Sequence, residues 1–174
     1  KEYRRQRQMC IRDRYKSNTK LFKVMCYSLK NGGKRFRPII IKEVSKSLNL
    51  RKNQYIKAMI AIELVHSYSL IHDDLPCMDD DDYRRGRLST HKKYDEAQAI
   101  LAGNSLLTMA FNLLSQDSNL SLVQLLSELS GHEGLAGGQS LDIYTIKRKL
   151  NNKLINKIHA VSYTHLTLPT ILLV

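Results

Sequence analysis

The sequence predicts an all-α protein, a bundle of helices joined by short connections. Eight glycines, three prolines and no tryptophan among 174 residues favour helix over the turn-rich texture of a β-protein. Apolar residues also recur at helical spacing through most of the chain. With 43% apolar residues, the chain can bury one ordinary core, so a single domain is expected.

Helical spacing begins at Tyr15, and the glycines at positions 32 and 33 supply a stop signal after residue 30. Pro38 is a favourable first-turn residue and opens a second predicted helix, which runs to about Leu48. Residues 54–72 are apolar on more than one side, which is typical of a central helix that other helices surround.

Two further apolar stretches complete the predicted bundle. Residues 95–114 repeat the pattern of the central helix. Residues 121–150 are expected to form one or two helices, interrupted near Gly137 and Gly138.

The two ends of the chain are predicted to lie outside the natural protein. Residues 161–170 can be encoded by DNA whose reverse complement encodes residues 4–13, an inverted repeat that folding does not require. The stretch resembles a sequencing adapter read through in translation. We therefore expect residues 1–14 and 161–174 to be adapter translation, and residues 15–160 to hold the protein domain.

The formal charge of +12 does not by itself indicate a nucleic-acid partner, because the basic residues are spread rather than interleaved with aromatics. A diphosphate is an equally suitable anionic partner. The apolar runs are far shorter than the roughly 20 residues that span a bilayer, so no membrane span is expected. Three cysteines without metal-type spacing fit reduced thiols in a cytoplasmic protein.

An acidic segment follows the central helix, with six aspartates among residues 73–82. Carboxylates at a helix C-terminus repel one another and the negative end of the helix dipole. Mg²⁺ relieves this repulsion, since it binds one or two carboxylates together with water and phosphate oxygens. Arg84 and Arg85 follow directly and suit phosphate. The combination predicts a diphosphate site, with a solvated acidic loop as the alternative.

A second cluster spans residues 32–38. Its glycines let the backbone approach an anion, Lys34 and Arg37 supply positive charge, and Pro38 opens a helix whose N-terminus also favours phosphate. An ordinary basic turn is the alternative interpretation.

These motifs resemble the first half of a bacterial trans-polyprenyl diphosphate synthase, the family of farnesyl and geranylgeranyl diphosphate synthases. The resemblance rests on residues 32–38, 64–86, 99–107 and 137–142. It implies a helical fold of the isoprenoid synthase type and a prenyltransferase that condenses isopentenyl diphosphate with dimethylallyl or geranyl diphosphate. A cytoplasmic homodimer is implied for the full-length protein.

The resemblance also implies roles for particular residues. Asp73 and Asp79 would hold Mg²⁺ with support from Asp74, and Arg84 would contact the allylic diphosphate. The residues expected to bind isopentenyl diphosphate are Lys34, Arg37, His66 and Arg85, with a core histidine as the alternative for His66.

Tyr68 lies five residues before Asp73 and would limit the product to fifteen carbons, as in a farnesyl diphosphate synthase. Geranylgeranyl diphosphate synthase is the next interpretation. The family's second aspartate-rich motif and its later Lys-Thr pair do not occur in the chain, so we expect the chain itself to be inactive.

Two interpretations from other classes are kept open. A metal-dependent phosphohydrolase would use adjacent His72 and Asp73, with His91 or His132 as further ligands. A basic RNA-binding protein or a non-catalytic partner subunit would instead bind without turnover.

Overall fold

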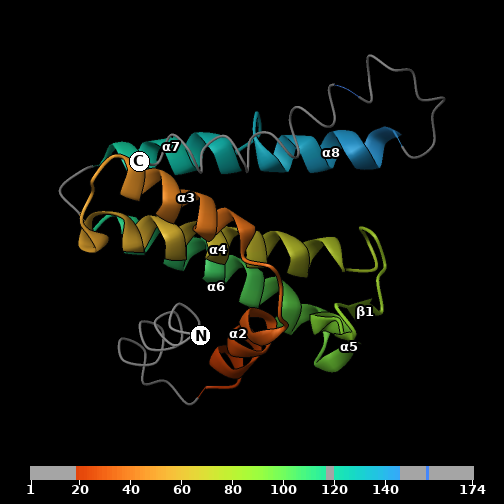
Figure 1. Ribbon diagram of the computed structural model, residues 1–174. Helices are drawn as coiled ribbons and strands as arrows, with labels where there is room; N and C mark the ends of the chain where they lie inside the picture. Colours follow the sequence, from red (N-terminus) through yellow and green to blue (C-terminus); the bar gives the residue numbers. More distant parts are fainter. Residues whose placement is uncertain (1–18, 117–119, 146–155, 157–174) are drawn as a thin grey trace. The chain divides into compact units, whose positions relative to one another are not determined.

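The computed structural model describes residues 19–116, 120–145 and 156 (Figure 1). The predicted adapter segments, residues 1–14 and 161–174, lie outside the described residues. The helices in chain order are α2 (Lys20–Lys30), α3 (Phe36–Ser47), α4 (Lys52–Asp73), α5 (Thr90–Lys93), α6 (Glu96–Leu114), α7 (Ser121–Ser130) and α8 (Leu135–Thr145). The prediction of an all-α protein is confirmed, with one short hairpin, β1 (Tyr83–Arg84) and β2 (Arg87–Leu88), that the sequence did not predict.

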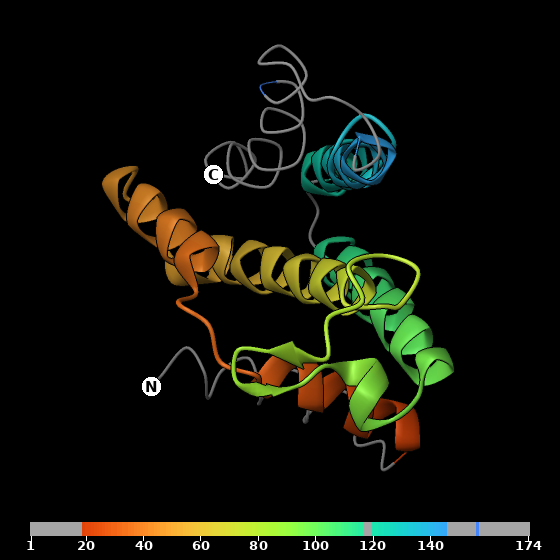
Figure 2. The ribbon, with the colours of Figure 1, turned by 90° about the vertical axis from the view of Figure 1, so that its right-hand side faces the viewer.

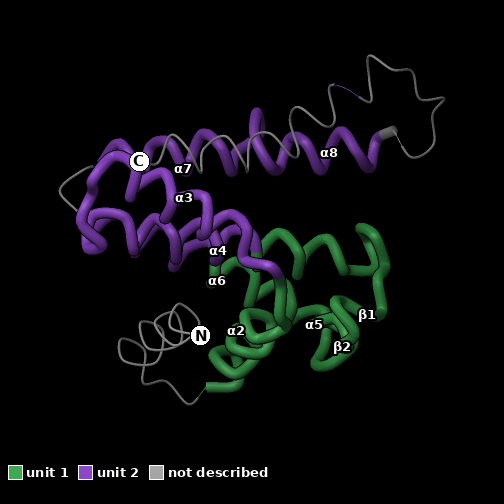
Figure 3. The backbone as a smooth tube through the Cα atoms, in the orientation of Figure 1, with its two compact units in different colours: residues 1–33, 67–106 green, residues 34–66, 107–174 purple. Residues whose placement is uncertain are grey.

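The chain divides into two compact units, which Figure 3 colours separately. Unit 1 comprises residues 1–33 and 67–106, and unit 2 comprises residues 34–66 and 107–174. The division falls within α4 and within α6, so each of these helices contributes to both units.

In unit 1, α2 begins where Thr19 caps it. The Thr19 hydroxyl oxygen accepts a hydrogen bond from the Phe22 backbone N–H at 3.3 Å, which satisfies one of the free donors of the first turn. The helix ends at Asn31, whose N–H bonds the Ser28 carbonyl at 3.2 Å. Between these ends, Val24 and Leu29 are among the fully buried side chains of its inner face.

The same unit places α2 beside α5 and the hairpin, and Figure 2 shows these elements side by side. The Tyr27 hydroxyl donates to the Leu88 carbonyl at 2.7 Å, and the Ser28 and Thr90 hydroxyls lie 3.0 Å apart. The Arg87 guanidinium lies 4.7 Å from the centre of the Tyr27 ring, a cation–π contact. These contacts fix the hairpin on the surface of α2.

In unit 2, α3 begins at Phe36, two residues earlier than predicted. Pro38 therefore occupies the third position of the helix, still within the first turn, where a backbone N–H has no intrahelical partner to lose. Within the part of α4 in unit 2, every residue from Ala58 to Val65 is buried, so the helix is shielded on all sides there. This confirms the expectation of a central helix.

Helix α6 has a mean hydropathy of 1.3 over an 18-residue window, so by length and composition alone it could cross a membrane. Core helices of soluble proteins meet the same criterion. Its fully buried positions, Ala99, Ala102, Leu106, Ala110 and Leu114, recur every three or four residues. They form a single stripe, which is the pattern of a helix that packs one face against others.

The break predicted near Gly137 and Gly138 is wrong. Both glycines lie inside α8, and the chain leaves helical geometry between Ser130 and Leu135. Gly131 adopts an extended conformation and its N–H returns to the Glu128 carbonyl at 3.3 Å, which ends α7. Gly131 is thus the residue that interrupts the apolar pattern, and residues 146–150 of the predicted segment lie outside the described residues.

Candidate active site

The acidic segment folds back on the end of α4. The Asp79 N–H donates to the Asp73 carbonyl at 2.9 Å, and the Asp80 N–H donates to the Leu75 carbonyl at 3.1 Å. Asp73 is half-buried and Asp79 is exposed. The backbone therefore brings the two predicted metal ligands together, although five residues separate them in the sequence.

The donor chemistry of this pair suits a hard divalent cation. Two aspartates at one helix end offer carboxylate oxygens, and Mg²⁺ binds proteins through one or two such groups while keeping positions for water and phosphate. Because the helix dipole adds negative potential at the end of α4, a cation is favoured there further. The residues present fit the predicted metal.

Asp74 points away from solvent and binds Arg84. Its side chain is 3% exposed, and its Oδ1 accepts hydrogen bonds from Nε of Arg84, at 2.7 Å, and from Nη2. Arg84 Nη2 also donates to Asp81 Oδ2 at 2.8 Å. Asp74 thus holds the guanidinium at the acidic segment, a positioning role that complements the predicted support of the metal pair.

Burial raises the pKa of the Asp74 carboxyl, and the hydrogen bond and charge of Arg84 oppose that rise. Burial also lowers the pKa of the Arg84 guanidinium, but the hydrogen bond and charge of Asp74, and then the charge of Asp81, raise it above the ordinary value. Arg84 therefore stays cationic beside the acidic segment.

The hairpin turn places Arg85 against the glycine turn that follows α2. Arg85 and Gly86, the two central residues between β1 and β2, both have positive φ, 56° and 74°, as a type I′ turn requires. Arg85 Nη1 donates to the Gly32 carbonyl at 2.6 Å. At Gly33, whose φ is 115°, an added Cβ would lie 2.1 Å from the same nitrogen, so only glycine admits this approach. Two predicted phosphate motifs, 53 residues apart, meet here.

The other predicted isopentenyl diphosphate ligands belong to unit 2. Lys34 is exposed, while Arg37 at the start of α3 and His66 on α4 are half-buried. The structure therefore assigns Arg85 to one unit and these three residues to the other.

Glu63 is a residue of unit 2 that the sequence analysis missed. It is 1% exposed within the apolar part of α4, and its Oε1 forms an ion pair with Nη1 of Arg35. Arg35 precedes α3 in a left-handed conformation, with φ 56°, which is uncommon for a residue with a side chain. The ion pair fixes the backbone between Lys34 and Arg37. The sequence signal that could have identified Glu63 is that it is the single acidic residue in an otherwise apolar helical stretch.

Tyr68 and His72 pack against each other one turn apart on α4. Their ring centroids lie 4.9 Å apart at an interplanar angle of 76°, an edge-on contact. Burial, and then the charge of Asp73, raise the pKa of the Tyr68 hydroxyl. His72 Nε2 lies 3.2 Å from the Ile100 carbonyl oxygen, and burial lowers the pKa of the ring. His72 thus links α4 to α6.

Gly103 makes the His72 contact possible, because a Cβ at this position would lie 2.2 Å from His72 Nε2. In an unobstructed helix, alanine in place of glycine stabilises by about 1 kcal/mol. Here the added methyl group is expected to cost about 1–3 kcal/mol by displacing the ring, so Gly103→Ala lowers the free energy of unfolding. Urea unfolding measures the change.

The matched control is the same substitution in a His72→Ala background, where no ring obstructs the methyl group. There Gly103→Ala should be stabilising. An increase in stability in both backgrounds would contradict the contact.

The alternative interpretation as a phosphohydrolase required His72 to act as a metal ligand beside Asp73. Among the described residues, the group of three side chains that could hold a metal consists of Asp80, Asp82 and His91, and excludes His72. His132, another proposed ligand, has a side chain that is 94% exposed. The geometry therefore gives this alternative no support.

Comparisons with known proteins bear on the family of the chain. Residues 18–165 match the family model described as polyprenyl synthetase. The chain is 45% identical to farnesyl diphosphate synthase of Micrococcus luteus over 148 residues, covering 82% of this chain and 51% of that protein. It is 44% identical to farnesyl diphosphate synthase of Bacillus subtilis (strain 168) over 147 residues, covering 80% of this chain and 50% of that protein.

The fold is shared with a solved geranyltransferase from Legionella pneumophila, with a TM-score of 0.88 and 32% identity over 98% of this chain and 64% of that one. This likeness confirms the predicted helical fold of the isoprenoid synthase type. The chain spans about half the length of the curated relatives it matches. Since the family model covers most of the sequence, the resemblance is confirmed, and the chain belongs to the polyprenyl synthetase family.

Proposed function

We propose that the chain forms the front half of a farnesyl diphosphate synthase, an enzyme that condenses isopentenyl diphosphate with dimethylallyl or geranyl diphosphate. The observation that carries the proposal is the return of Asp79 to Asp73 at the end of α4, beside a guanidinium that Asp74 holds in place. The names of the curated relatives support the fifteen-carbon product.

Asp73 and Asp79 would hold Mg²⁺, which supplies electrostatic stabilisation of the diphosphate that departs from the allylic substrate. Arg84 contributes a fixed positive charge at the same place, because Asp74 and Asp81 orient it before substrate arrives. Such preorganised charge stabilises a leaving group more than mobile solvent does. The carbon bond then forms between the allylic carbon and the double bond of isopentenyl diphosphate, which afterwards loses a proton.

Lys34, Arg37, His66 and Arg85 would bind the diphosphate of isopentenyl diphosphate. Two contacts, one in each unit, support this assignment. Arg85 is held by the Gly32 carbonyl, and the Arg35–Glu63 ion pair fixes the segment that carries Lys34 and Arg37. A basic group held in place loses less side-chain entropy when an anion binds.

Tyr68 would limit product length, because its half-buried ring lies on α4 five residues before Asp73 and is braced by His72. Tyr68→Ala in the complete enzyme is expected to shift the main product from fifteen carbons to twenty or more. Chromatography of the dephosphorylated alcohols measures the shift, and Tyr68→Phe, which keeps the ring, should still give fifteen carbons. An unchanged product from Tyr68→Ala would remove this role.

Three finer proposals concern the whole protein. We propose that it is cytoplasmic, which cell fractionation tests, and that it forms a homodimer when full length, which sedimentation of the complete protein tests. We also propose that residues 1–14 and 161–174 are adapter translation. The family match reaches residue 165, five residues into the second of these segments, and direct sequencing of the locus decides whether the natural gene encodes them.

The experiment that tests the function is condensation of labelled isopentenyl diphosphate by the complete gene product. Dimethylallyl and geranyl diphosphate are supplied separately with Mg²⁺, and the label is followed into prenyl products. Incorporation with both primers supports the proposal. Incorporation with neither refutes it.

A further inference from the structure

His91 is a buried histidine that the proposed reaction does not use. It lies in α5, is 6% exposed, and its Nδ1 lies 3.2 Å from the Ser89 hydroxyl oxygen. Its Nε2 is shielded from solvent and has no hydrogen-bond partner in the part of the chain that the structure describes. A buried polar atom left without a partner destabilises the fold, so its retention requires an explanation.

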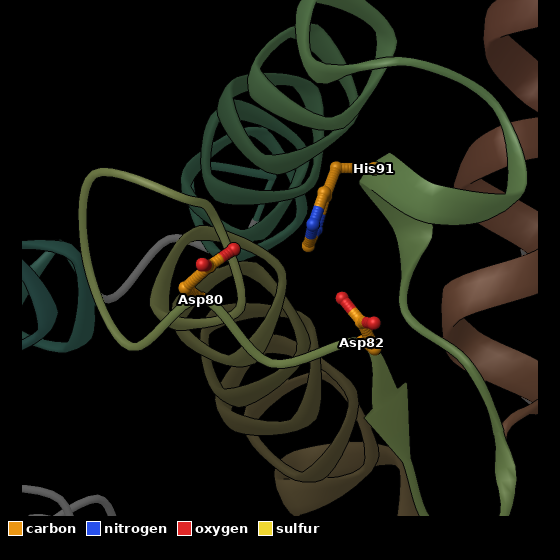
Figure 4. Close-up of side chains that lie close together, drawn as sticks. All are labelled: Asp80, Asp82 and His91. Carbon is orange, nitrogen blue, oxygen red and sulfur yellow. The ribbon is translucent and has the colours of Figure 1, made fainter.

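Two exposed carboxylates lie beside this ring. One ring nitrogen of His91 and one oxygen each of Asp80 and Asp82 lie within 4.8 Å of one another. Figure 4 shows the three side chains directed toward a common space. They come from separate segments, the acidic loop and α5.

The backbone holds these segments in place. The Asp80 N–H is bonded to the Leu75 carbonyl at 3.1 Å, and the Ser89 N–H is bonded to the Asp82 carbonyl at 2.9 Å. The second bond extends the β1–β2 pairing directly to the residue that precedes α5. These backbone bonds hold the segments that carry the three side chains in place.

We propose that Asp80, Asp82 and His91 bind a divalent transition-metal cation, Mn²⁺ or Zn²⁺. An imidazole with two carboxylates suits these ions, whereas Mg²⁺ favours oxygen ligands alone. Metal–ligand bonds of about 2.0–2.2 Å require the ligand atoms to close slightly, and the exposed aspartate side chains are free of the core and can move toward the fixed ring. Ser89 orients the imidazole through its other nitrogen, as outer-shell partners of metal-bound histidines do.

The Lys92 ammonium group already pairs with Asp82, so it would compete with a cation for that carboxylate. Its Nζ lies 2.8 Å from Asp82 Oδ1. Both side chains are exposed, 40% and 59%, so solvent screens this ion pair and makes it weak. A divalent cation can take the other Asp82 oxygen or displace the ammonium group.

This site is separate from the proposed magnesium pair, because neither Asp73 nor Asp79 belongs to the group. Its effect is structural. A cation bound there would join the acidic loop to α5 and so stiffen the backbone that carries Asp79.

The test uses Mn²⁺ alone with the purified 174-residue chain and pulsed electron paramagnetic resonance, which detects a nitrogen nucleus bound to the metal. The wild-type chain should show coordinated imidazole nitrogen, and His91→Gln should lose it. Asp80→Asn and Asp82→Asn alter exposed residues that the core does not need, and each should weaken Mn²⁺ binding about 10–100-fold. Zn²⁺ should displace the Mn²⁺ that carries the nitrogen signal.

Two control variants make the result specific. Asp73→Asn with Asp79→Asn removes the proposed magnesium ligands and should leave the nitrogen signal intact, and Asp95→Asn, elsewhere on unit 1, should change nothing. The proposal is overturned if wild-type Mn²⁺ shows no bound nitrogen. It is equally overturned if His91→Gln, shown to be folded by circular dichroism, keeps that nitrogen, or if Asp80→Asn and Asp82→Asn bind Mn²⁺ as the wild type does.

Discussion

Asp73→Ala is expected to lower the rate of condensation by the complete enzyme about 10²–10³-fold, the loss typical when a fixed electrostatic partner of a transition state is removed. The substitution removes the carboxylate alone. The carbonyl that accepts the Asp79 N–H belongs to the backbone, so the fold of the acidic loop should persist. Steady-state kinetics with geranyl and isopentenyl diphosphates measure the rate.

Asp95→Asn is the matched control for this prediction. Asp95 is another aspartate of unit 1, exposed and paired with Lys20 at 3.5 Å, and an asparagine can still accept the Gln98 N–H that starts α6. Its rate should equal that of the wild type. A tenfold or smaller loss for Asp73→Ala would contradict a central role for the carboxylate.

Glu63→Ala is expected to destabilise the protein by about 3–5 kcal/mol, because it leaves the Arg35 guanidinium without its buried partner. The Glu63 side chain is 2% exposed and that of Arg35 is 19% exposed, so water can replace little of the lost interaction. Chemical denaturation followed by circular dichroism measures the free energy of unfolding.

A double substitution separates the ion pair from simple loss of packing. Arg35→Met with Glu63→Met replaces both charges by apolar groups of similar length, and stability should return to within about 1–2 kcal/mol of wild type. The condensation assay should then show a raised KM for isopentenyl diphosphate, since the ion pair no longer fixes the segment between Lys34 and Arg37. A Glu63→Ala protein as stable as the double variant would contradict the pairing.

The features that depend on local sequence pattern could be predicted from the sequence. The helical spacing of apolar residues predicted the central helix, and the observed α4 (Lys52–Asp73) differs from the predicted 54–72 by two residues at one end and one at the other. The density of aspartates followed by two arginines predicted charge compensation, and the structure shows it in Arg84, which pairs with Asp74 and Asp81.

Features that depend on contacts between distant residues were not predictable in the same way. The type I′ turn at Arg85 and Gly86 lacks the usual Asn-Gly signal, and it is held by a carbonyl 53 residues away. Glu63 pairs with Arg35, which lies 28 residues earlier in the sequence, and no short-range sequence pattern indicates this ion pair. The break between α7 and α8 was misplaced because four glycines follow one another closely, and the break falls at Gly131 and Gly134 while Gly137 and Gly138 are helical.

We propose that this chain comes from an enzyme that joins two isoprenoid diphosphates with the aid of a divalent cation. The measurement that tests it most directly follows prenyl products, inorganic diphosphate and inorganic phosphate together. The complete gene product receives geranyl and isopentenyl diphosphates, with Mg²⁺ or with a chelator. We predict a fifteen-carbon diphosphate and one released diphosphate per condensation, with Mg²⁺ alone. Release of phosphate from either substrate without a longer prenyl product would contradict the account.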